Sequence, residues 1–178
     1  MPAIQQMTAL QLLQDLFRHM EWADATVWRS VLNSPAASAD QRIKDWLHHI
    51  HMVQHAFINV WREQQHSENA GSEFALTELP EWSREFHQLA AAYLQTLSEE
   101  DLDKPFVMPW AKYLTKHIGR DPGMTTKGET ILQVAAHSTY HRGQVNARLR
   151  ELGSEPPLVD YIAWLWFGRP AADWAVAK

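Results

Sequence analysis

Apolar residues recur with the period of an amphipathic α-helix in four long segments of the chain and one short one. The segments run from Thr8 to about Asn33, from Ser38 to about Trp61, from Pro80 to Leu97, from Thr126 to Leu152 and from Asp160 to Trp166. Three of them open with a capping box, in which a Ser or Thr and a Gln or Glu three residues later satisfy free backbone N–H groups. These boxes are Thr8 with Gln11, Ser38 with Gln41 and Thr126 with Glu129.

The region between the third and fourth long segments, residues 98–126, lacks a helical period and is rich in Pro and Gly. Its apolar run Phe106–Trp110 is typical of a short extended piece, and we expect a long structured connection without a true sheet. The chain is therefore predicted to be all-α: a four-helix bundle with a long crossover between the third and fourth helices and a short C-terminal helix. We expect a single domain over residues 1–178.

Composition narrows the class of protein. Hydrophobic residues make up 46% of the 178 residues and charged residues 21%, which is a globular balance. The net charge is −5 and the Lys and Arg residues are scattered, so we expect no nucleic-acid partner. There is neither a basic leader nor an apolar run of membrane-spanning length, which favours a cytoplasmic protein with no membrane partner. Cysteine is absent, so any thiol chemistry must use an external thiol.

His137 and His141 provide the most informative spacing, because residues four apart on a helix lie one turn apart on the same face. This is a metal-chelating arrangement. Two imidazoles do not hold a transition metal tightly in water, so a metal site requires a third ligand from another element. The spacing alone leaves open that both are histidines at the edge of the core, satisfied by hydrogen bonds.

Four histidines on the second long helix compete for the role of third ligand. At about 100° per residue, His48, His51 and His55 fall opposite the apolar stripe and are predicted to face solvent. His49 lies at the flank of that stripe, where an imidazole can reach into the bundle, and is the predicted third ligand. The pair His51 and His55 is itself spaced as a metal clamp, but this phase places it outside the bundle.

The fourth long helix has a second stripe of mostly small residues, which predicts burial on two sides, against another helix of this chain or of a symmetry mate. The stripe comprises Leu132, Ala136, Tyr140, Gly143 and Ala147. Two arginines on the same helix, Arg142 and Arg148, are predicted to be solvated or paired at the surface.

Four motifs of this chain resemble those of the DinB/YfiT-like family of metal-dependent bundle proteins. They are His137–Val145, Leu47–Ile50, Met20–Asp24, and Pro156–Pro157 through Asp160–Ile162. The first is similar to the family's helix signature with both metal-binding histidines, and in the second the family's remaining ligand matches His49. The chain departs from the family pattern at Ala136, where Asn is common, and at Gln54, where an acidic residue is common.

The resemblance implies a homodimeric four-helix bundle that binds a divalent ion, nickel or zinc, through His49, His137 and His141. Some relatives are thiol S-transferases that use bacillithiol or mycothiol. The leading hypothesis is a metal-dependent thiol transferase acting on a small-molecule substrate with an external low-molecular-weight thiol. A metal-dependent hydrolase and a non-catalytic, stress-related binding bundle remain alternatives, so whether the protein is an enzyme stays open.

Overall fold

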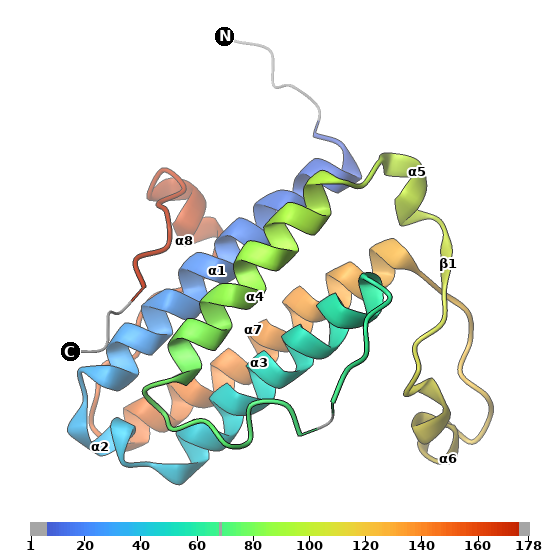
Figure 1. Ribbon diagram of the computed structural model, residues 1–178. Helices are drawn as coiled ribbons and strands as arrows, with labels where there is room; N and C mark the ends of the chain where they lie inside the picture. Colours follow the sequence, from blue (N-terminus) through green and yellow to red (C-terminus); the bar gives the residue numbers. More distant parts are fainter. Residues whose placement is uncertain (1–6, 68, 175–178) are drawn as a thin grey trace, which may run out of the picture.

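The capping boxes at Thr8 and Thr126 start the first and last long helices as the sequence predicts, with the side chain of each accepting from the backbone N–H three residues on. The computed structural model describes residues 7–67 and 69–174. Its four long helices are α1 (Ala9–Leu32), α3 (Gln41–Trp61), α4 (Leu79–Gln95) and α7 (Lys127–Glu151). Helices α1 and α3 each pack against both α4 and α7, so the predicted all-α four-helix bundle is confirmed (Figure 1).

The second predicted capping box is wrong. The segment Pro35–Ser38 forms its own short helix, α2, and the hydroxyl of Ser38 donates to the Val31 carbonyl at 2.9 Å. Helix α3 is capped instead by Asp40, which accepts from the Ile43 N–H at 3.0 Å. Both residues are good cap formers, and Asp40 prevails because Ser38 is already inside a helical turn.

The crossover between α4 and α7 is more structured than the sequence indicates. It contains α5 (Glu99–Leu102), a 3-10 helix η1 (Ala111–Leu114) and α6 (Thr115–Ile118). Two short strands, β1 (Pro105–Phe106) and β2 (Thr125–Thr126), pair antiparallel and close the excursion. The expectation of no sheet is therefore wrong, because these two strands form a small two-stranded sheet. The sheet brings the chain back to the start of α7 (Figure 1).

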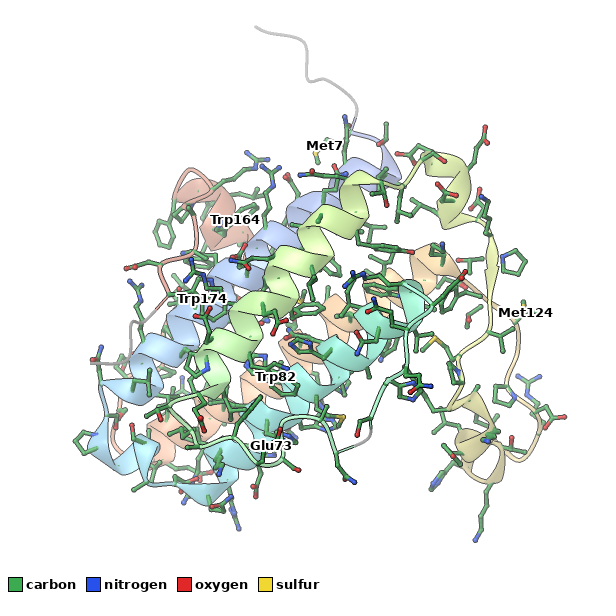
Figure 2. The ribbon with its side chains drawn as sticks, in the orientation of Figure 1. Met7, Glu73, Trp82, Met124, Trp164 and Trp174 are labelled. Carbon is green, nitrogen blue, oxygen red and sulfur yellow. The ribbon has the colours of Figure 1, made fainter. Side chains whose placement is uncertain are left out.

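The C-terminal helix α8 (Tyr161–Trp166) lies against α1. Trp164 is 1% exposed and packs with Trp22 of α1, whereas Trp166, two residues on, is 79% exposed. Figure 2 shows Trp164 within this segment. No helix among residues 7–67 and 69–174 is long and apolar enough to cross a bilayer.

A buried polar layer divides the core into two apolar halves. One half includes Met20, Phe57, Phe86 and Val134, and the other includes Val27, Ile50, Leu79 and Val145. Between them each of the four long helices contributes polar side chains, which are Asp24, His51, Gln54, His87, Ser138 and Arg142. Every long helix therefore presents polar groups to the centre of the bundle at about the same height.

Candidate metal centre

Three histidines from two helices meet between α3 and α7. His49 comes from α3, and His137 and His141 come from successive turns of α7. One nitrogen from each ring lies within 4.8 Å of the other two, and the Nε2 atoms of His49 and His137 are 3.2 Å apart. All three side chains are half-buried. The structure therefore brings together the three histidines that the sequence singles out.

Hydrogen bonds determine which nitrogens are free for a ligand. His141 Nδ1 lies 2.6 Å from the side-chain oxygen of Gln144, one turn further along α7, so its Nε2 is left for the cluster. A neutral imidazole that donates from Nδ1 has its lone pair on Nε2, which is the state a metal needs. His137 Nδ1 is buried and has no partner among the described residues. Gln144 therefore orients one ring of the three.

Burial lowers the pKa of two of the three histidines. The pKa of His137 is lowered to about 4, first by burial and then by the neighbouring rings of His141 and His49. The pKa of His49 is also lowered, first by burial and then by the charge that His141 would carry. Because protonated imidazoles cannot ligate, these shifts keep two of the three lone pairs available at neutral pH.

The residues present fit a divalent ion. Zinc binds imidazole nitrogens at about 2.0–2.1 Å, so two ligands of a tetrahedral ion lie roughly 3.3 Å apart. The 3.2 Å between His49 Nε2 and His137 Nε2 matches that spacing. Two neutral rings at this distance can share only one hydrogen bond, so an ion satisfies the cluster better than the rings satisfy one another. A set of three imidazoles suits zinc, nickel, copper or iron.

The predicted exposure of the other α3 histidines is wrong. His51 is fully buried and His55 nearly so, while His48 is half-buried and bonds the Ala70 carbonyl at 3.0 Å. His51 Nδ1 contacts Gln54 at 2.8 Å and its Nε2 accepts from Trp28 Nε1 at 2.9 Å, and His55 Nε2 bonds the Trp82 carbonyl. Protein groups thus occupy the nitrogens that the alternative His51 and His55 clamp would use.

The phase error has a physical origin. The predicted stripe was centred on residues such as Trp46, Val53 and Val60, which are only half-buried because they line the flank beside His49. The buried arc of α3 is centred on Leu47, Gln54 and Trp61. At 100° per residue it is rotated by roughly 80° toward His51. Polar side chains that find internal partners are not excluded from a core, and hydrophobic period cannot detect them.

The predicted surface position of Arg142 is also wrong. The residue is 3% exposed, and its Nη1 donates to Asp24 Oδ1 at 2.7 Å. Asp24 Oδ2 also accepts from Gln54 and faces His87 Nε2 at 3.0 Å. Burial on its own would raise the pKa of Asp24, but Arg142 and the hydrogen bond from His87 hold it well below its usual range. The layer therefore contains an ionised carboxylate with all of these groups donating to it.

The helical period of the apolar residues does not predict this polar network. The signal that could have found it is the position of two members, since Asp24 ends the Met20–Asp24 motif and Arg142 directly follows His141. Arg148 behaves as predicted, pairing at the surface with Asp40 at 2.6 Å. The second stripe of α7 is exposed instead of packed within the chain, since Tyr140 is 65% and Leu132 51% exposed. Burial of that stripe against a symmetry mate stays a prediction.

Comparison with known proteins agrees with this architecture. The sequence profile of the DinB family matches residues 7–170. The chain is also similar to Protein DinB of Bacillus subtilis (strain 168), with 24% identity over 165 residues that cover 85% of this chain and 92% of that protein. The match includes all four long helices and the three clustered histidines.

Proposed function

The chain belongs to the DinB family, and from that premise we propose that it is a metal-dependent enzyme whose divalent ion, nickel or zinc, is held by His49, His137 and His141. The observation that carries the proposal is the convergence of three ring nitrogens within 4.8 Å between α3 and α7. Three protein ligands leave a coordination position open, which is the arrangement of catalytic sites and not of closed structural ones.

Thiol transfer is the activity we propose for this site. A divalent ion held there would act as a Lewis acid that lowers the pKa of a thiol or a water molecule and so favours the nucleophilic form at neutral pH. The chain has no Cys, so a transferred thiol has to come from an external low-molecular-weight compound. The substrate class that completes such a reaction is a small electrophile.

The residues around the cluster have supporting roles in this proposal. Gln144 accepts from His141 Nδ1 and keeps the Nε2 lone pair pointed at the cluster. Tyr140 is exposed and its ring lies edge-on to His141, with 4.9 Å between centroids. Its ring therefore lies beside one of the three proposed ligands.

Two alternative functions would use the same three histidines as metal ligands. A hydrolase would activate water at the site and would need no thiol. A non-catalytic bundle would use the ion for stability or sensing, and would show a large rise in melting temperature with metal but no turnover. A requirement for added thiol distinguishes the transferase from the hydrolase. Turnover distinguishes both enzymes from the non-catalytic bundle.

The ligand assignment is tested by titrating chelator-treated protein with Zn²⁺ and Ni²⁺, with elemental analysis of the loaded protein. His49→Ala, His137→Ala and His141→Ala are each expected to weaken binding by at least about tenfold. His48→Ala is the matched control, because His48 lies next to His49 on α3 but bonds Ala70 instead. Wild-type affinity in all three cluster variants would rule out the site.

The activity is tested on the metal-loaded protein with a small electrophile such as 1-chloro-2,4-dinitrobenzene. We expect turnover that requires both the ion and an added low-molecular-weight thiol, and that falls to background in His137→Ala. Turnover of an ester or amide without thiol would support the hydrolase. Tight metal binding with no turnover across a panel of thiols and electrophiles would support the non-catalytic bundle and reject transfer.

A further inference from the structure

A pocket lies on the opposite side of the bundle from the three clustered histidines. It has a volume of about 300 Å³ and lies between α1 and α4, whereas the histidine cluster lies between α3 and α7. Figure 1 shows α1 and α4 side by side on the face away from α7 and α3. Its apolar wall includes Phe17 and Leu94, and its polar lining includes Gln14, Glu21 and His87. This volume is at the lower end of the range for small-molecule sites.

His87 forms a built feature at the base of this pocket. The residue is 3% exposed, yet it lines the pocket, and its Nε2 lies 3.0 Å from Asp24 Oδ2. Asp24 is ionised and can only accept, so Nε2 carries the proton. In the neutral ring, Nδ1 is then a hydrogen-bond acceptor, and it has no partner among the described residues. An acceptor without a protein partner at a pocket is available to a ligand that donates a hydrogen bond.

Two more acceptors surround it. Glu21 accepts from Trp174 Nε1 at 3.2 Å with one carboxylate oxygen, and the other has no partner in the part of the chain that the structure describes. Gln14 donates its amide to the Leu94 carbonyl at 3.2 Å, which leaves its own oxygen free to accept. The cation Arg18 also lines the pocket, and its guanidinium is paired with Asp15. Glu21 is therefore a carboxylate without a cationic partner at the rim.

One aromatic ring lines the pocket, and another lies next to two of its lining residues. Trp174 lies 5.6 Å from His87 between ring centroids, and Figure 2 shows it beside α1 and α4. Phe17 forms part of the wall and packs on Phe86 behind it. Aromatic faces attract organic cations, and apolar walls favour a compact hydrocarbon body. The pocket thus combines acceptors, a negative charge and aromatic surface.

We propose that the α1/α4 pocket is a second small-molecule site, which binds a compact organic amine. The ammonium group pairs with Glu21 and donates a second N–H to His87 Nδ1, and the apolar body lies against Phe17 and Leu94. The inference does not depend on the metal centre, because none of these residues belongs to the histidine cluster.

Calorimetric titration of the full chain with benzylamine, in EDTA at pH 7.5, tests this site. We expect saturable binding with Kd below about 1 mM. Benzyl alcohol, which lacks the charge, and phenylacetate, which reverses it, are expected to bind at least tenfold more weakly. Equal binding of all three probes, or no saturable binding of benzylamine, would overturn the proposal.

Variants locate the bound amine. Ala91 is exposed and lines the pocket, so Ala91→Trp fills it without disturbing the core, while Ala92→Trp adds the same ring at an exposed neighbour outside the lining. Ala91→Trp and Glu21→Gln are expected to weaken benzylamine binding at least tenfold, and Ala92→Trp less than twofold. Unchanged binding in Ala91→Trp, or loss of binding in His137→Ala, would place the amine elsewhere and reject the site.

Discussion

Arg142 and Asp24 form an ion pair inside the bundle, with 2.7 Å between Nη1 and Oδ1 and 3% of each residue exposed. The pair joins α7 to α1, and Gln54 and His87 extend it to α3 and α4. Since His141 precedes Arg142 in the sequence, the helix turn that holds this pair also carries a ligand of the proposed metal centre. The buried layer therefore holds the register of α7 against the rest of the bundle.

Breaking this pair is expected to destabilise the protein strongly. Arg142→Met removes the cation and leaves Asp24 as a buried carboxylate, which costs about 3–5 kcal/mol of unfolding free energy. Urea unfolding of the metal-free protein measures the loss. Arg148→Met is the matched control on the same helix, because its pair with Asp40 is partly exposed, with 25% and 11% of the two side chains accessible, so its loss should cost less than loss of the buried pair. Equal losses in both variants would contradict the role of the buried layer.

The sequence predicts the helices better than the faces they bury. Capping boxes at Thr8 and Thr126 are local, since all their hydrogen bonds form within one turn, and they start helices where expected. His51 and Arg142 were expected outside because their burial depends on partners distant in sequence, Trp28 and Asp24. Those partners exist only once the bundle has formed, so no local pattern reveals them.

The histidine cluster was predictable because two independent signals coincide. His137 and His141 share a helix face by spacing alone, and the Leu47–Ile50 motif points to His49 by resemblance. The hydrophobic phase used for α3 was misplaced, and on the observed phase His49 lies outside the buried arc, among half-buried residues. The resemblance is therefore the signal for His49 that does not depend on the phase, which also reversed the expected burial of His51.

Gln144 is expected to tune metal affinity through His141. Gln144→Leu removes the acceptor at 2.6 Å from His141 Nδ1, so the ring loses its orientation, and Zn²⁺ binding should weaken by about 10–100-fold. Gln144→Glu keeps an acceptor and should retain affinity. Competition titration with a zinc chelator measures both. Gln133→Leu, an exposed change on the same helix, serves as the control, and an equal effect there would refute the assignment.

Acidification is expected to destabilise the metal-free protein through buried histidines. Burial lowers the pKa of His51 to about 4, against 6.5 in the unfolded chain. Between these values the unfolded state binds more protons, so unfolding free energy falls as pH drops below 6.5 and does not change through this group above it. From pH 7 to pH 5, His51 alone accounts for about 2 kcal/mol.

Urea unfolding in EDTA at pH 7 and pH 5 measures this dependence. His51→Gln should show a decrease about 2 kcal/mol smaller than the wild type shows, whatever its stability at pH 7. His117→Gln, at an exposed position on α6, should follow the wild type. If the unfolding free energy of His51→Gln decreased between pH 7 and pH 5 as much as that of the wild type, other groups would be responsible for the pH dependence.

The exposed stripe on α7 leads us to propose a homodimer. Leu132, Ala136, Tyr140, Gly143 and Ala147 share one face, and all five are exposed in a single chain. The small residues Ala136, Gly143 and Ala147 permit close approach of a second helix, which a two-fold axis would supply from the same stripe. Light scattering after size exclusion should give twice the 20.6 kDa of one chain.

Charge on this stripe should separate the two copies. Leu132→Glu together with Ala147→Glu places like charges in a self-complementary interface, so we expect a monomer whose helical circular dichroism is unchanged. Leu114→Glu, at a similarly exposed position on η1, should leave the dimer intact. A wild type that elutes as a monomer at high micromolar concentration would reject the homodimer. A dimer that survives the α7 substitutions and yields to Leu114→Glu would move the interface to the crossover segment.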